Sequence, residues 1–359
     1  MGKDISEIDK NLKITTSLKE EDIVFFDVRG EPFGIHGVYS CDEEAVFKRI
    51  PSDVAKATSE GVNILNYHTA GGRVKFKTNS KYIALKTKMK SVTVFPHMTL
   101  AGTSGFDLYI NNEGRSTYYK TFMPPVGMEG GYESIIYFDD NSERDLTINF
   151  PLYNDVSDLY IGLQKSAVLK KGGEYKYKNP VVYYGSSITQ GGCASRPGNS
   201  YPAIISRELD CDYINLGFSG SAKGEEMIVD YMAGLEMDVF VCDYDHNAPN
   251  TEHLVNTHER IYTKLREKNF ELPIIFISKP GFNPFSLDDI QRRDVIYSTY
   301  INAVNNGDKN VYYIDGQSLF GDRYRDGCTV DGVHPNDLGF MRMAQTIGDV
   351  VGKLLGCTD

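Results

Sequence analysis

The chain of 359 residues contains no tryptophan, no Cys-x-x-Cys pair and no long hydrophobic run. Its six cysteines are scattered, which argues against a structural zinc site and against a disulfide framework. A membrane-spanning helix needs roughly 18 consecutive apolar residues, and no stretch of the sequence approaches that length. We therefore expect a reduced protein that does not cross a membrane.

Positive charge is also scarce. Lysine and arginine total 38 against 49 aspartates and glutamates, and the formal net charge is −11. Nucleic acids and anionic membrane surfaces attract proteins through basic patches, so this balance speaks against both as partners. The opening segment, MGKDISEIDKNL, is polar and shows no signal peptide, which predicts a cytoplasmic protein.

The first half of the chain, from about residue 24 to 163, alternates apolar and polar side chains. Examples are VKF at 74–76 and LTINF at 146–150. This alternation, with turn residues between the runs, is typical of antiparallel strands. Many short strands of this kind predict an all-β sandwich or jelly roll, with one helix near residues 51–60. We place this domain at residues 1–172.

The second half follows a polar, glycine-containing linker at 170–178 and has a different pattern of apolar residues. Continuous apolar runs alternate with helical patterns, and these runs lie at 181–184, 213–216, 239–242, 273–277 and 311–314. Such strands are typical of a parallel sheet covered on both faces. The pattern predicts a flavodoxin-like, three-layer α/β/α domain at residues 173–359, with strand order 2-1-3-4-5.

Polar residues gather just after the predicted strands. GSSIT follows the first strand at 185–189, NLGFSG closes the second at 215–220, and DYDHN closes the third at 243–247. DGVHPN at 331–336 precedes the last helix. Ligands of parallel α/β sheets bind beyond the carboxyl ends of the strands, so we expect these groups to meet at one edge.

These residue types suit acyl transfer. A serine attacks only when a histidine accepts its proton, and the histidine needs an acceptor on its other ring nitrogen. Asp331 and His334, on one loop, can supply that pair. The tetrahedral intermediate then needs donors for its oxyanion, and the candidates are the Ser187 and Gly220 amides and the Asn247 side-chain amide.

The four segments resemble, in the right order, sequence blocks of the SGNH hydrolase superfamily, also called GDSL esterases. In this resemblance Ser187 stands at the place of the nucleophile and Gly220 at an oxyanion position. The resembling segments are residues 185–191, 215–220, 245–248 and 331–335. In addition, GFDLY at 105–109 resembles the GxDLY motif that names a β-rich domain preceding some of these hydrolases.

The chain departs from the family blocks at a few positions. Ser186 replaces an aspartate in the first block, and Asp245 and Ala248 replace a glycine and an aspartate in the third. None of these changes removes a residue with a catalytic role, because the triad acid comes from the block with Asp331. They indicate a subfamily with a different pocket entrance.

The resemblance implies a two-domain serine esterase in which Ser187 attacks, His334 acts as base and then acid, and Asp331 orients the imidazole. It suggests short acyl esters, notably acetyl esters on carbohydrates or other small molecules. A lysophospholipase or thioesterase is one alternative. A non-catalytic carbohydrate-binding protein with a relic hydrolase domain is another.

Two further interpretations concern the same loops. A phosphate-binding loop would place a lysine after Gly191 and Gly192, and none is there. Asp243, Asp245 and His246 leave a divalent-metal site open as an alternative, although no His-x-x-x-His motif supports it. We expect neither a metal nor another cofactor.

Overall fold

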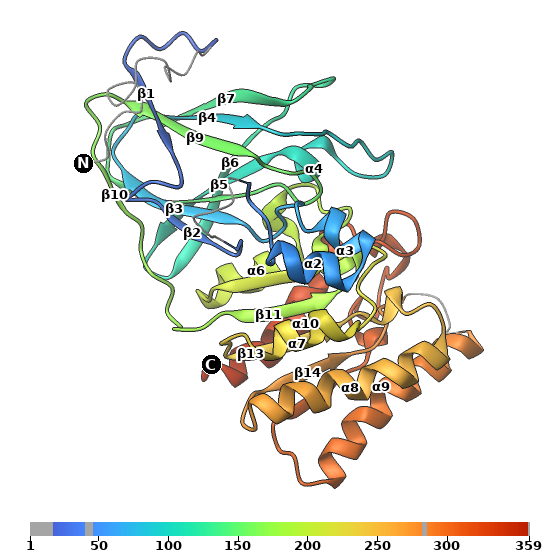
Figure 1. Cartoon of the computed structure of the whole chain (residues 1–359). Coiled ribbons are helices and arrows are strands. Elements are labelled where there is room, and N and C mark those ends of the chain that lie inside the picture. Colours follow the sequence, from blue (N-terminus) through green and yellow to red (C-terminus); the bar gives the residue numbers. More distant parts are fainter. Residues whose placement is uncertain (1–16, 40–45, 282–285, 358–359) are drawn as a thin grey trace. The chain divides into compact units, whose positions relative to one another are not determined.

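The computed structural model describes residues 17–39, 46–281 and 286–357 (Figure 1). The chain divides into two compact units. Of the described residues, the first consists of 17–39, 46–49, 67–176 and 196–198, and the second of 50–66, 177–195, 199–281 and 286–357. No helix in the described ranges combines the length and the hydropathy needed to cross a bilayer.

The first unit contains two antiparallel sheets. One has the order β1-β9-β4-β7, with bounds Ile23–Asp27, Asp158–Gln164, Tyr82–Lys88 and Gly131–Tyr137. The other has the order β10-β3-β8-β5-β6, with β2 paired to β3. Its bounds are Leu169–Lys171, Arg73–Thr78, Arg144–Asn149, Phe106–Asn112 and Arg115–Phe122, with β2 at Gly34–His36. One short helix, α4 (Leu100–Ser104), precedes β5.

The two sheets share one hydrophobic core. Phe76 and Ile148 from one sheet and Leu85 and Ile161 from the other are fully buried in the same cluster. Their polar neighbours in sequence point the other way, as the period-two pattern requires. The predicted all-β sandwich is confirmed.

The second unit is built on a five-stranded parallel sheet. Its order is β12-β11-β13-β14-β15, which is the predicted 2-1-3-4-5. The bounds are Tyr213–Gly217, Val181–Gly185, Val239–Asp243, Ile274–Ile277 and Val311–Ile314. The main helices are α6 (Tyr201–Leu209), α7 (Glu226–Ala233), α8 (Thr251–Lys268), α9 (Leu287–Asn305) and α10 (Asp337–Leu354).

Helices cover both faces of this sheet. On β11, the ring of Tyr183 packs 5.6 Å from that of Tyr201 on α6, and Tyr201 stacks 6.5 Å from Phe340 on α10. The next residue, Tyr184, lies in a core cluster with side chains from α7, α8 and α9, of which α8 neighbours both of the others (Figure 1). The predicted three-layer α/β/α architecture is thereby confirmed.

The helix predicted near residues 51–60 is in fact two helices, α2 (Ser52–Thr58) and α3 (Glu60–Leu65). They separate at Ser59, whose extended backbone (φ −171°, ψ 164°) interrupts the helical path. The Ser59 side chain then caps α3 by accepting the Val62 N–H. A single helical pattern does not reveal such a break, because serine is tolerated inside a helix as well as at its start.

Both helices belong to the second unit, although they interrupt the β-rich part of the sequence. Ala55 and Val62 lie in the hydrophobic core of the α/β unit. Two hydrogen bonds join the ends of the segment 50–66, because the Asn66 side chain accepts the Ile50 N–H and donates to the Ile50 carbonyl. The two units are therefore discontinuous in sequence, whereas the sequence predicts a single boundary between residues 172 and 173.

Candidate active site

The turn after β11 presents the serine pair. The side-chain oxygen of Ser186 accepts the Ile188 N–H at 3.1 Å and so caps α5 (Ser187–Gln190). A Cβ atom on Gly185 would lie 2.1 Å from Thr189 Oγ1, so only glycine allows this tight return of the chain. The two hydroxyls thus have different surroundings, because that of Ser186 caps the helix and that of Ser187 lies 2.9 Å from His334 Nε2.

Ser187, His334 and Asp331 form a continuous hydrogen-bonded chain. Ser187 Oγ lies 2.9 Å from His334 Nε2, and His334 Nδ1 lies 2.7 Å from Asp331 Oδ2. The other oxygen, Asp331 Oδ1, accepts the backbone N–H groups of Val333 and His334 at 3.0 and 2.8 Å. The structure brings together the nucleophile, base and acid that the sequence predicts, in the order that acyl transfer requires.

The carboxyl group of Asp331 is held in its charged form. Its removal from water acts to raise the pKa, but hydrogen bonds from the His334 backbone, the His334 ring and the Val333 backbone outweigh this effect. The net result lowers the pKa of Asp331 to about 2. At neutral pH an imidazolium formed on His334 would therefore stand beside a negative charge.

The loop that carries Gly220 follows β12. Gly220 has φ +67°, and a Cβ there would meet no atom within 4 Å, so the backbone conformation and not the space requires glycine. The Asn247 side chain donates to the Phe218 carbonyl at 2.8 Å, and the Ser219 N–H donates to Gln190 Oε1 at 3.0 Å. Asn247 thus braces the loop that presents the other predicted oxyanion donor, while its amide nitrogen retains a second hydrogen.

Gln190 is a residue that the sequence interpretation did not single out. It belongs to the same short helix as Ser187, and its side chain fixes the Gly220 loop. The signal that could have identified Gln190 was its position within residues 185–191, the segment that resembles the first block of the family.

Asp243 lies fully buried beneath the nucleophile turn. Burial raises the pKa of Asp243 to about 7, against the opposing effect of hydrogen bonds from Thr189 and Tyr201. Asp245 forms a buried ion pair with Arg292 at 2.8 Å. Asp243 Oδ2 and Asp245 Oδ1 therefore already bond to protein donors, which does not favour the alternative of a metal site at these atoms.

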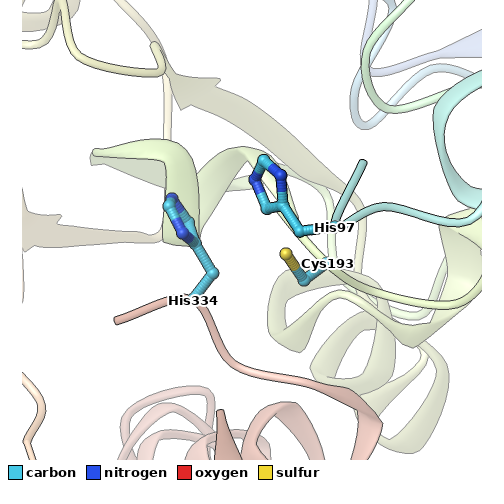
Figure 2. Close-up of side chains that lie close together, drawn as sticks. All are labelled: His97, Cys193 and His334. Carbon is cyan, nitrogen blue, oxygen red and sulfur yellow. The ribbon is translucent and has the colours of Figure 1, made fainter. Parts of the chain in front are cut away.

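Cys193 lies next to the candidate base (Figure 2), with its Sγ within 4.8 Å of a His334 ring nitrogen. Figure 2 also labels His97, which belongs to the first unit. Burial, together with the negative charge of Asp331, raises the pKa of the Cys193 thiol to about 12. A neutral thiol is a weak nucleophile, so Ser187 is the better candidate for attack.

The GFDLY motif of the first unit has a structural role. Asp107 is fully buried in β5. Its Oδ1 accepts from the Asn149 side chain at 2.8 Å, and its Oδ2 accepts from Arg196 Nη1 and the Gly198 N–H, both at 2.9 Å. A Cβ on Gly198 would lie 2.2 Å from the Tyr109 hydroxyl. The motif therefore holds the segment 196–198, which follows the nucleophile helix in the sequence.

Replacing Asp107 with alanine is expected to destabilise the β-rich unit by about 3 kcal/mol, because it leaves Arg196 largely buried without its carboxylate. Urea unfolding measures this loss. The control is Glu174→Gln, which breaks the exposed pair with Lys171 and should change stability by less than about 0.5 kcal/mol. Equal effects of the two changes would contradict the anchoring role.

Comparison with known proteins gives two family matches. Residues 178–352 match the GDSL-like Lipase/Acylhydrolase family, and residues 23–169 match the GxDLY family, the N-terminus of Esterase_SGNH_hydro-type. Between them they cover most of the chain. The protein belongs to the GDSL-like acylhydrolases of the SGNH type, with an N-terminal GxDLY domain.

Solved structures share this fold. A candidate GDSL-like lipase from Bacteroides ovatus ATCC 8483 is 28% identical, with a TM-score of 0.82, and the match covers 93% of this chain and 98% of that one. A salicylyl-acyltransferase from a tetracycline biosynthetic pathway shares the fold at 17% identity and a TM-score of 0.76, covering 94% and 98%. An acetyl xylan esterase from the rumen bacterium Butyrivibrio proteoclasticus does so at 14% and 0.60, covering 94% and 100%. No curated protein matches the sequence.

Proposed function

We propose that this protein is a serine esterase that hydrolyses short acyl esters, acetyl esters above all, with Ser187 as the nucleophile. The observation that carries the proposal is the chain of hydrogen bonds from Ser187 through His334 to Asp331, with links of 2.9 and 2.7 Å. This geometry is the one in which a histidine activates a hydroxyl and a carboxylate fixes the tautomer of the histidine.

The reaction proceeds through an acyl-enzyme. Ser187 Oγ attacks the ester carbonyl carbon while its proton passes to His334 Nε2, and the oxyanion accepts hydrogen bonds from the Ser187 amide and its partner donors. The intermediate collapses, and the alcohol leaves with the proton from His334. Water then attacks the acyl-enzyme by the same route, which releases the acid and restores Ser187.

The proposed partner oxyanion donors are the Gly220 amide and the Asn247 side chain. The Asn247 side chain donates to the Phe218 carbonyl at 2.8 Å, and this bond fixes both the Asn247 amide and the loop that carries Gly220. A donor that is already fixed costs no reorganisation when the negative charge develops, which is the source of its catalytic effect.

The acetyl group is proposed as the acyl part and a carbohydrate as the alcohol part. The fold shared with an acetyl xylan esterase supports both suggestions, and the complete Ser187, His334 and Asp331 arrangement favours an active enzyme over a relic. A lysophospholipase or thioesterase would use the same three residues. The lysophospholipase would differ in accepting a long acyl chain, and the thioesterase in expelling a thiol in place of an alcohol.

A chain-length series of p-nitrophenyl esters tests the acyl preference. We expect kcat/KM to fall by about tenfold or more from acetyl to octanoyl, because each excess methylene must fit a pocket made for a short chain. A preference for octanoyl or longer esters would contradict the proposal and favour the lipase-like alternative. Acetylated oligosaccharides, assayed for released acetate, then test the alcohol part.

Labelling with a fluorophosphonate tests catalytic competence independently of the substrate. We expect stoichiometric labelling of the wild type and none of Ser187→Ala. Failure of the wild type to react would instead support the non-catalytic alternative.

A further inference from the structure

The loop that presents Gly220 is fixed from two directions by contacts already described. From α5, Gln190 accepts the Ser219 N–H, and from η3 (Asp245–Asn247), Asn247 donates to the Phe218 carbonyl. The same carbonyl also accepts the Ser221 N–H at 2.9 Å within the loop. The position of the Gly220 amide therefore depends on the contacts that fix residues 218–221.

A third contact comes from α3, far away in the sequence. A Cβ atom on Gly61 would lie 2.2 Å from Ser221 Oγ and 3.0 Å from Ser221 Cβ. The Oγ atom can turn away by a change of rotamer, but the Cβ atom cannot move unless the loop backbone moves with it. Gly61 has no positive φ, so it is the close approach to Ser221 that requires glycine here.

The helix cannot easily withdraw to make room. Its first turn is capped by Ser59, and Val62 is fully buried in the core of the α/β unit. The two hydrogen bonds between Asn66 and Ile50 fix the two ends of the segment 50–66 that contains α3. Because a packed interior resists added volume, a side chain at Gly61 would be accommodated mainly by displacement of the Ser221 loop.

We propose that Gly61 is a positioning residue for catalysis, and that α3 sets the place of the Gly220 amide by packing directly against Ser221. This inference rests on the proposed function, in which the Gly220 amide binds the oxyanion. Oxyanion donors act at about 2.7–3.1 Å from the developing charge. A misplacement of about 1 Å costs on the order of 10² in rate, so the shift of a few tenths of an ångström that a 3.0 Å approach of the two Cβ atoms requires is expected to slow the reaction severalfold.

The variant Gly61→Ala tests the proposal in the full-length protein. We expect kcat for p-nitrophenyl acetate to fall by about threefold to tenfold, with KM nearly unchanged, because the lost interaction is made only in the transition state. The pH dependence of kcat/KM should stay the same, because the hydrogen-bonded chain of Ser187, His334 and Asp331 is not touched. The melting temperature should not fall enough to account for the loss, since alanine suits a helix better than glycine.

A second change supplies the decisive control. Ser221→Gly removes both atoms that the new Cβ would meet, so Gly61→Ala/Ser221→Gly should recover kcat to within about 1.5-fold of Ser221→Gly alone. Gly234→Ala is the matched control, because its Cβ would come no closer than 3.5 Å to any atom, an ordinary contact, and should leave kcat unchanged. An unchanged kcat in Gly61→Ala, or a loss that Ser221→Gly does not relieve, would overturn the proposal.

A readout without substrate separates this inference from the proposed function. In spectra of ¹⁵N-glycine-labelled protein, we expect the Gly220 amide resonance to shift when Gly61→Ala is made in the wild type. It should stay in place when Gly61→Ala is added to Ser221→Gly, with Ser221→Gly alone as the reference. If the wild type shows no ester turnover, the proposed function fails, and this resonance alone decides whether Gly61 positions the loop. A Gly220 resonance that does not move in Gly61→Ala refutes the positioning role.

Discussion

Replacing Ser187 with alanine is expected to lower kcat for an activated acetyl ester by about 10⁴ to 10⁶, while the protein stays folded. Ser187 Oγ is the hydroxyl that lies 2.9 Å from His334 Nε2. Without it, the base has no nucleophile to activate, and only the oxyanion donors and binding contribute to the residual rate. Steady-state turnover of p-nitrophenyl acetate, with thermal melting as the check on folding, measures the effect.

The neighbouring serine provides a matched control. Ser186→Ala removes the bond to the Ile188 N–H, an N-cap interaction worth about 1 kcal/mol, and should lower the melting temperature more than Ser187→Ala does. We expect its kcat to stay within about tenfold of the wild type, because a lost cap of this size shifts the nucleophile turn only slightly. Equal losses of activity in the two variants would contradict the assignment of Ser187 as the nucleophile.

Asp331→Asn is expected to lower kcat by about 10⁴. The asparagine can still accept the two backbone N–H bonds at Val333 and His334, so the loop should keep its shape. What it loses is the negative charge beside His334 Nδ1 and the acceptor that holds the ring in the correct tautomer. The control is Asp326→Asn, which removes the same charge from an exposed site in η5 (Asp326–Cys328) and should leave kcat unchanged.

The same carboxyl group makes a defined contribution to the pH dependence of stability. Its pKa is lowered on folding, from 3.8 to about 2, so the stabilisation is present above pH 3.8 and is lost as the pH falls toward about 2. We expect the free energy of unfolding to fall less steeply over this range in Asp331→Asn than in the wild type. An acid limb of activity above this range cannot come from Asp331. Identical acid unfolding of the two proteins would show that Asp331 forms no such bonds in solution.

Several features of this protein could be predicted from its sequence because their signals are local. The period-two pattern of the first half predicted the antiparallel sandwich. The continuous apolar runs alternating with helical patterns in the second half predicted the parallel α/β sheet, and the structure confirms both. Asp331 and His334 are three residues apart on one loop, so their pairing needs no knowledge of the fold. The carboxyl ends of parallel strands lie at one edge of their sheet, which is why Ser187 could be expected close to Asp331 and His334.

Other features were decided only by the tertiary structure, because they join residues far apart in the chain. Asp107 meets Gly198 across 91 positions, and nothing near either residue indicates the other. The helix that carries Gly61 lies within the β-rich sequence but packs in the α/β unit, where it approaches Ser221. Hydrophobic periodicity tells which face of an element is buried, not which element covers it. The sequence by itself therefore determined the elements and the reacting groups, and only the folded chain determined which distant residues hold those groups in place.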